Sequence, residues 1–119
     1  MTLPAPFNSH HTAWVRCSAP ECRPRAVRYG VDGSRLVCFG DRELADVGHG
    51  TQVRVAVHEI AGGPLLAELT ATLRDASPDE VGPDAIQVLL EHVPLGRNSH
   101  EIELATAHHG ARRVVVLQP

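Results

Sequence analysis

Four arginines lie close together near the start of the chain and carry its most suggestive chemistry. They are Arg16, Arg23, Arg25 and Arg28. A guanidinium group binds phosphate or carboxylate through paired hydrogen bonds, so a cluster of them predicts a site for an anionic ligand. The alternative is a solvated face neutralised by Asp32, Glu21 and their neighbours, because charged faces are common and surface ion pairs contribute little free energy.

Charge and composition exclude two classes of partner. The net charge is −3, and all 11 basic residues are arginine. A chain with this balance has no overall attraction for nucleic-acid backbones or anionic lipid. Aromatic residues make up only 3% of the sequence, too few for a platform that stacks single-stranded bases. We therefore expect neither a nucleic acid nor a membrane as partner.

A cytoplasmic location is predicted from the start of the chain and from its cysteines. Residues 1–11 lack the charged and apolar segments of a secretion signal, and no apolar run approaches the ~18 residues of a membrane span. The 3 cysteines cannot all pair within one chain, which suits a reducing compartment better than a disulfide scaffold.

Cysteine and histidine, the usual zinc ligands, occur repeatedly in the first half of the chain. They are Cys17, Cys22, Cys38, His10, His11, His49 and His58. Four residues separate Cys17 from Cys22, a spacing that some zinc sites tolerate, but no second pair of ligands follows. His58-Glu59 opens like a metalloprotease motif, yet position 62 is Gly instead of His. We therefore expect no metal site and interpret Cys17 and Cys38 as small apolar residues within strands.

No motif identifies a catalytic residue. The sequence contains no Gly-x-Ser-x-Gly elbow, no Walker loop and no Gly-x-Gly-x-x-Gly. We interpret Gly62-Gly63 and Gly48-His49-Gly50 as turns. The catalytic group, if the protein is an enzyme, is therefore unknown from the sequence.

Alternating apolar residues predict three strands in the first third of the chain. These strands cover 13–18, 25–31 and 35–39. Asp32-Gly33 tolerates the positive φ angles of a tight hairpin turn and so joins the second strand to the third. Arg16 and Arg28 fall on the polar faces of their strands, where both could line one groove. Asp41 is then expected to cap a short helix that ends at Gly48 or Gly50.

Two consecutive runs over 51–60 and 65–74 give the clearest signal in the sequence. Apolar residues alternate with polar ones in both runs, and a Gly62-Gly63 turn joins them. This pattern predicts a hairpin with one buried face and one solvated face.

A longer helix is predicted in the last third of the chain. Its apolar stripe consists of Ile86, Leu89, Leu90 and Val93. Residues 77–80 have the form of a capping box, but Gly82-Pro83 interrupts it, so the helix starts at one of these two places. Residues 99–108 fit a helix or a strand, with helix preferred. Residues 113–118 predict a final strand whose valines are buried on both faces.

Together these elements predict a mainly β fold with minor α content. Six strands joined by tight turns pair antiparallel, and complete or partial closure into a barrel removes exposed edges. With 119 residues, the chain is expected to form one domain over 12–119, preceded by a loose lead-in over 1–11.

The arrangement over 12–75 resembles the split β-barrel flavoproteins of the pyridoxamine 5′-phosphate oxidase-like family. The resemblance rests on the turn Cys22-Arg23-Pro24-Arg25, the Asp32-Gly33 turn, the strand closing on Phe39-Gly40-Asp41, and the long hairpin over 51–74. It implies a six-stranded antiparallel split β-barrel with one longer helix and one short helix. The family usually has a Thr or Ser and a Lys near the short helix, where this chain has Gly40-Asp41-Arg42-Glu43.

The same resemblance implies a homodimer with a cofactor in a cleft between the subunits. The cofactor is FMN, or in some branches the deazaflavin F420 or haem. Basic side chains of the second strand and of the start of the short helix hold its phosphate, and these match Arg23, Arg25 or Arg28 and Arg42. We expect Arg25, Arg28 and Arg42 to bind the phosphate, because guanidinium groups beside a helix N-terminus suit an anion.

The function expected from these residues is FMN-type cofactor binding by an oxidoreductase that acts on a small soluble substrate. The cofactor would carry the chemistry, while the protein supplies a phosphate clamp, a slot for the ring and exclusion of water. The alternative is a non-enzymatic β-barrel module for ligand binding or dimerisation that has lost the cofactor. Asp41 and Glu43 favour this alternative if they point into the cleft, because they would repel a phosphate.

Overall fold

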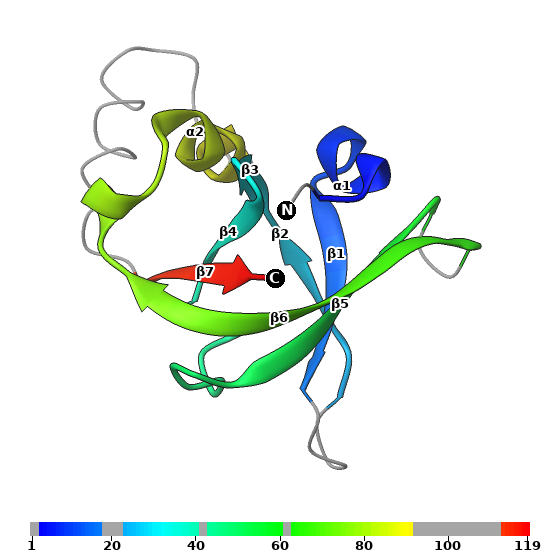
Figure 1. Ribbon diagram of the computed structural model, residues 1–119, viewed down its shortest axis with the longest axis horizontal. Helices are drawn as coiled ribbons and strands as arrows, with labels where there is room; N and C mark the ends of the chain where they lie inside the picture. The colour runs from blue at the N-terminus through cyan, green and yellow to red at the C-terminus, as the bar shows by residue number, and fades with distance from the viewer. Residues whose placement is uncertain (1–2, 18–22, 41–42, 61–62, 92–112) are drawn as a thin grey trace.

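One antiparallel sheet dominates the computed structural model of the protein, which describes residues 3–17, 23–40, 43–60, 63–91 and 113–119 (Figure 1). The 7 strands in this part of the chain are β1 (Thr12–Cys17), β2 (Arg25–Arg28), β3 (Gly30–Asp32), β4 (Arg35–Phe39), β5 (Gln52–His58), β6 (Leu65–Ala76) and β7 (Val114–Gln118). The helical segments are α1 (Ala5–Ser9), the 3₁₀-helix η1 (Pro78–Glu80) and α2 (Pro83–Glu91). The predicted mainly β fold class is confirmed.

The sheet runs in the order β2-β1-β5-β6-β7-β4-β3, so β2 and β3 are its edges. These two edges are neighbours in the chain, separated only by Tyr29, whose backbone N–H donates to the carbonyl oxygen of His11 over 2.8 Å. The segment predicted as one strand over 25–31 therefore pairs with β1 through its first half and with β4 through its second. This division at Tyr29 accounts for 7 strands where 6 were predicted. No ladder joins β2 to β3, so the described sheet is curled but not closed.

Two apolar clusters lie on opposite sides of β4 and β7. The larger fills the inside of the curled sheet, and the smaller lies between the sheet and α2. Val115 and Leu117 belong to the first cluster, while Val114 and Val116 belong to the second. All four side chains are buried, so the prediction that this strand is covered on both faces is confirmed.

The hairpin predicted over 51–74 is confirmed as β5 and β6. Alternate residues of β5 are buried, and the polar residues between them are exposed or half-buried. The strand register is continuous from Gln52 opposite Thr72 to Val57 opposite Ala67, and a bulge follows. Beyond the bulge the hairpin projects from the body of the molecule (Figure 1).

The two predicted starting points of the longer helix begin two separate helical segments. Residues 77–80 form a capping box on the short 3₁₀-helix η1, in which the Ser77 backbone N–H donates to Glu80 Oε1 over 3.3 Å. The α-helix itself begins at Pro83. Residues 99–108 lie outside the described residues. Within the described part of the chain, no helix is long and apolar enough to cross a membrane.

The lead-in predicted to be loose over 1–11 is packed on the core over its described part. Residues Ala5–Ser9 form α1, and the side chain of Phe7 is 0% exposed. Tyr29 donates a hydrogen bond from its hydroxyl to the carbonyl oxygen of Phe7 over 2.8 Å. The two rings lie 6.2 Å apart in a tilted arrangement. A single aromatic residue in a Pro-rich segment thus anchors α1, a short helix that was not predicted from the sequence.

The short helix predicted after Asp41 is absent from the described residues, because 43–46 form turns. Arg113 accounts for this difference. Its Nη1 donates to the carbonyl oxygen of Leu44 over 3.0 Å, its Nη2 donates to that of Val47 over 2.7 Å, and its Nε donates to Asp75 Oδ1 over 2.9 Å. The loop is therefore held by the Arg113 side chain, just before β7, instead of by a series of helical hydrogen bonds.

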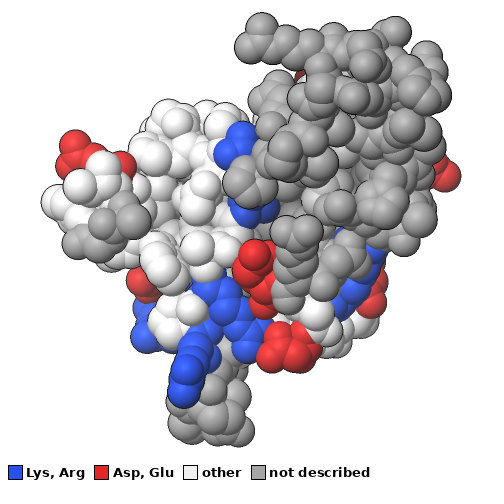
Figure 2. Space-filling model, turned by 180° about the vertical axis from the view of Figure 1, so that it is seen from behind, with Lys and Arg blue, Asp and Glu red and all other residues white. Residues whose placement is uncertain are grey.

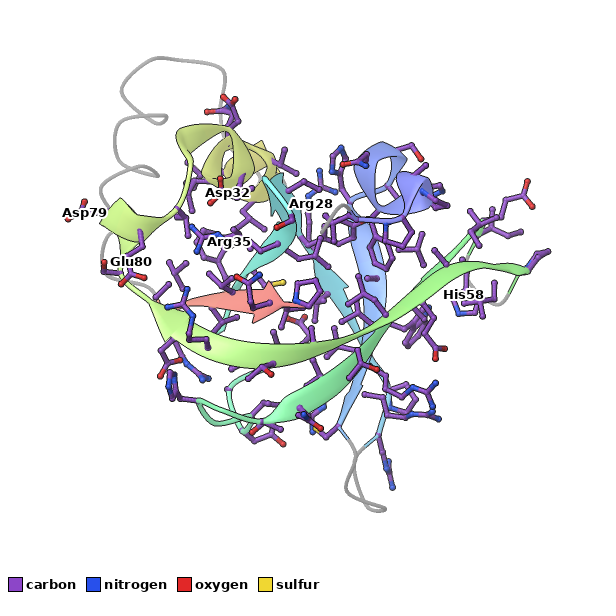
Figure 3. The ribbon with its side chains drawn as sticks, viewed as in Figure 1. Arg28, Asp32, Arg35, His58, Asp79 and Glu80 are labelled. Atoms are coloured by element: carbon purple, nitrogen blue, oxygen red, sulfur yellow. The ribbon has the colours of Figure 1, made fainter. Side chains whose placement is uncertain are left out.

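The Asp32–Arg35 ion pair lies within the β3–β4 hairpin, and a further hydrogen bond from Arg35 fastens this hairpin to η1, which precedes α2 (Figure 3). Arg35 donates from Nε and Nη2 to Asp32 Oδ2 over 3.1 and 2.8 Å, and Nη2 also donates to the carbonyl oxygen of Glu80 over 2.5 Å. The Asp32 and Arg35 side chains are only 25% and 22% exposed. Hydrogen bonding from Arg35 holds the pKa of Asp32 below its usual value, and the Gly82 backbone acts in the same direction.

This lowered pKa predicts a loss of stability in acid. Because the folded-state pKa of Asp32 lies below the unfolded-state value, the ionised carboxylate stabilises the protein fully above the unfolded pKa. That contribution is lost as the pH falls through the folded pKa. We expect Asp32→Asn to lower the melting temperature at pH 7 and to reduce the further loss between pH 5 and pH 2.5. Asp79→Asn removes an exposed carboxylate nearby and is the control. Parallel pH profiles for Asp32→Asn and the wild type would contradict this role.

Candidate functional site

Arg25 and Arg28, two of the three predicted phosphate-binding residues, already bind protein groups. Arg25 forms a two-pronged ion pair with Asp46, with Nη1–Oδ1 and Nη2–Oδ2 distances of 2.5 and 2.8 Å, and also donates to the carbonyl oxygen of Glu43 over 3.2 Å. Arg28 donates from Nε to the carbonyl oxygen of Val88 in α2 over 3.2 Å. Both guanidinium groups thus hold the fold together in addition to any other role.

The structure does not bring Arg25 and Arg28 together. They are three positions apart on β2, so their side chains leave opposite faces of the strand. Arg25 reaches the loop at 43–46 and Arg28 reaches α2. Arg42 lies outside the described residues, as does Asp41, and Glu43 is exposed. Arg23, the alternative on the same segment, is exposed and makes no hydrogen bond to another described residue.

A different pair of arginines meets on the outer face of the sheet. Arg16 on β1 lies directly opposite Arg54 on β5, and both are exposed. Like charges directly opposite one another on adjacent strands repel. Arg54 is compensated by an ion pair with Glu68 on β6. Arg16 makes no ion pair or hydrogen bond with any residue that the structure describes, so this point of the sheet has an excess of positive charge.

Trp14 lies one row along the same face, between small residues on both neighbouring strands. Its cross-strand partners are Ala26 on β2 and Ala56 on β5. Because alanine side chains are short, the indole borders a depression in the sheet surface. A recess of about 330 Å³ lies here, and Trp14, Arg16, Arg54, Ala56, His58 and Glu68 are among the residues that line it. We call it the Trp14 groove.

His58 closes the groove at the base of the projecting hairpin (Figure 3). Its Nδ1 lies 3.0 Å from the carbonyl oxygen of Gly63. A carbonyl oxygen can only accept a hydrogen bond, so Nδ1 carries the proton and Nε2 of the neutral ring is an acceptor. The turn of the hairpin therefore fixes the tautomer of a histidine that borders the groove.

The groove has an uncharged end and a cationic end. Figure 2 shows cationic side chains gathered beside a broad uncharged area on the rear face of the molecule. Arg16 and Arg54 supply positive charge beside the indole, and Ala56 and Leu65 supply apolar surface toward the hairpin. An indole next to guanidinium groups suits a flat ring that carries an anionic group. Any ring bound here would lie on the outer face of β1, β5 and β6.

The sequence contained part of this site. Arg16 belonged to the predicted cluster, and the alternation over 51–60 places Gln52, Arg54 and His58 on one face. The pairing of Arg16 with Arg54 was missed, because it depends on the register between β1 and β5, which are far apart in the sequence. No local pattern specifies a register between strands that a tight turn does not join.

Two of the cysteines in the zinc alternative, Cys17 and Cys38, lie within the described residues, whereas Cys22 lies outside them. Cys17 packs against the larger apolar cluster but is disulfide-bonded, so its interpretation as a free apolar cysteine is wrong. Cys38 is a free thiol with 0% exposure in the same cluster, as that interpretation expected. Burial raises the pKa of the Cys38 thiol to about 12, so it stays protonated. Among the described residues, no three His, Cys, Asp or Glu side chains gather where they could hold a metal ion.

Comparison with protein-family models, with curated proteins and with solved structures finds no match to this chain. The resemblance to the pyridoxamine 5′-phosphate oxidase-like family therefore stays a prediction. The Trp14 groove combines an aromatic side chain with Arg16, which has no ion-pair partner among the described residues.

Proposed function

We propose that the protein binds a flat aromatic ligand with a phosphate group, of the FMN type, in the Trp14 groove. The observation that carries this proposal is the direct cross-strand pairing of Arg16 with Arg54 beside Trp14. Only one carboxylate among the described residues, Glu68, compensates these two cations. A bound phosphate would remove their repulsion and add charge-assisted hydrogen bonds, each worth roughly 1.5–3 kcal/mol.

Trp14 supports the aromatic part of the proposal. The indole is half-buried, its cross-strand partners are the small residues Ala26 and Ala56, and it lines the recess. Offset stacking of a ring on an aromatic side chain contributes about 0.5–1.5 kcal/mol beyond the area it buries. The phosphate would lie at Arg16 and Arg54, and the ring would lie toward Ala56 and Leu65.

In this proposal the protein is an oxidoreductase acting on a small soluble substrate. A bound flavin supplies hydride or electron transfer. Arg16 and Arg54 position its phosphate, and the apolar wall of the groove excludes water. His58 lines the recess, and we assign it the role of orienting a substrate N–H or O–H group. The cytoplasmic location expected from the sequence belongs to the same proposal.

The second candidate is a non-enzymatic module that dimerises and binds a ligand without a flavin. The hairpin favours it, because three large apolar side chains, Ile60, Leu65 and Leu66, are 70%, 53% and 41% exposed. Exposed apolar patches mark interaction surfaces. The engagement of Arg25 and Arg28 by protein groups also favours it, since those side chains were expected to hold the phosphate. A homodimer is common to both candidates.

Trp14 is the only tryptophan in the chain, so its fluorescence reports directly on the groove. We expect titration with FMN to quench this emission and to release or absorb heat in a calorimeter with the same midpoint. Riboflavin, which lacks the phosphate, should bind at least tenfold more weakly. Arg16→Gln and Arg54→Gln should each weaken FMN binding by about tenfold, the equivalent of one charged hydrogen bond.

Matched variants distinguish a phosphate bound at Arg16 and Arg54 from a phosphate bound at the residues predicted from the sequence. Arg23→Gln changes an exposed arginine that does not line the groove, and should leave the FMN affinity unchanged. Arg25→Gln, Arg28→Gln and Arg42→Gln weaken binding if the phosphate lies where the sequence predicted it. Absence of both quenching and heat in the wild type would exclude flavin binding and leave the non-enzymatic module.

A further inference from the structure

A second polar site adjoins the Trp14 groove on the same face of the sheet. Gln52 on β5 lies opposite Thr72 on β6, and Thr72 lies opposite Gln118 on β7. These three side chains form one row across three strands. Gln52 and Gln118 are exposed and Thr72 is half-buried, and none of the three side chains makes a hydrogen bond to another described residue. Two amides and a hydroxyl are thus available to a ligand.

This row lies in a recess of its own. The recess measures about 330 Å³, and Thr70 and Arg74 also line it. Arg74 is paired with Glu80 over 3.3 Å, so the recess offers neutral hydrogen-bonding groups more than net charge. An amide both donates and accepts, which is the combination that matches the edge of a nucleobase or a set of sugar hydroxyls.

The two recesses are neighbours on the sheet, on either side of the Arg54–Thr70 pair. Thr70, which lines the polar recess, is the cross-strand partner of Arg54, which lines the Trp14 groove. Along β5, Ala56 beside the indole, Arg54 and Gln52 follow one another on the same face. Ala56 and Gln52 are four positions apart, which corresponds to about 14 Å at ~3.4 Å per residue. The outer face therefore presents an aromatic surface, then two cations, then neutral polar groups, in that order.

We propose that the ligand extends across this face and is a phosphate-bridged dinucleotide. Its flavin or other flat ring would lie on Trp14, its phosphates at Arg16 and Arg54, and its second nucleoside on Gln52, Thr72 and Gln118. The inference rests on the proposed function, because it takes the phosphate position from the Trp14 groove. It specifies the class of ligand, because a mononucleotide would cover only the aromatic surface at Trp14 and the two arginines.

The test compares three flavins on the full chain by calorimetry: riboflavin, FMN and FAD. We expect FAD to bind at least tenfold more tightly than FMN. Gln52→Ala and Gln118→Ala should each remove most of this difference while leaving the FMN affinity within twofold of the wild type. Thr72→Val, which keeps the volume and removes the hydroxyl, should act in the same direction. Gln87→Ala, an exposed glutamine on α2, is the matched control and should change neither affinity.

The outcomes separate this inference from the proposed function. If FMN binds with the Arg16 and Arg54 dependence described above but FAD binds no more tightly, the second site is overturned and the groove stands. If FAD binds more tightly but the Gln52, Gln118 and Thr72 variants keep that advantage, the second nucleoside lies elsewhere and the inference is likewise overturned. If neither flavin binds, the proposed function fails and the inference fails with it.

Discussion

Replacing Phe7 by alanine is expected to destabilise the protein by about 4 kcal/mol, the usual cost of removing a buried aromatic side chain. Phe7 is 0% exposed, contributes to the larger apolar cluster and packs at 6.2 Å from the ring of Tyr29. Its removal leaves a cavity and loosens α1, whose carbonyl oxygen at Phe7 accepts the Tyr29 hydroxyl hydrogen bond. Urea denaturation followed by far-ultraviolet circular dichroism measures the loss.

Asn8→Ala is the control for this substitution. Asn8 is the next residue of α1 and is exposed, so its truncation removes polar atoms from the surface without opening a cavity. We expect a change within about 0.5 kcal/mol, as is usual for surface sites. Equal and small effects of Phe7→Ala and Asn8→Ala would mean that α1 does not belong to the core.

Gly30→Ala is expected to cost about 3 kcal/mol, at the upper end of the range for overpacked sites. A Cβ at this position would lie 2.4 Å from the carbonyl oxygen of Ala85 and 2.7 Å from its Cα, both backbone atoms of α2. Backbone cannot move aside as the end of a flexible side chain can. The helix would have to lift from β3 and open the smaller apolar cluster, which includes Ile86 and Leu89.

Gly48→Ala serves as the matched control for the glycine substitution. No atom lies within 4 Å of a Cβ built at Gly48, and its φ is not in the left-handed region. We expect a change of about 0.5 kcal/mol or less in either direction. Thermal unfolding of the two variants in one buffer gives the comparison. A Gly30→Ala variant as stable as Gly48→Ala would show that α2 does not pack closely on β3.

The elements that could be predicted from the sequence are those whose neighbours in space are neighbours in the chain. The hairpin of β5 and β6 follows from two alternating runs and one glycine turn, and its polar face is the face that forms the Trp14 groove. The stripe of Ile86, Leu89 and Leu90 correctly predicted a helix lying on a core. The valines of β7 correctly predicted a strand covered on both sides, because no polar residue interrupts them.

The candidate site could be predicted only in part. The arginine cluster pointed to an anion, but the sequence favoured Arg25 and Arg28, which the structure shows bound to Asp46 and to the Val88 carbonyl oxygen. Arg16, from the same cluster, is the one that meets Arg54 beside Trp14. The protein partners of Arg25 and Arg28 are 21 and 60 positions away in the chain, and no local pattern shows which arginine will have such a partner.

The amino-acid sequence alone determined the β-rich class, the long hairpin and the alternation that gives each strand a buried and a solvated face, because side-chain direction repeats every two residues along a strand. The tertiary structure decided which strands lie side by side, and therefore which solvated side chains are neighbours on the sheet. The order β2-β1-β5-β6-β7-β4-β3 places β1 beside β5 and β6 beside β7, although each pair is separated by more than 30 residues of chain. The Trp14 groove and the polar row both lie across these long-range contacts, where the pairing is set by burial of the whole sheet.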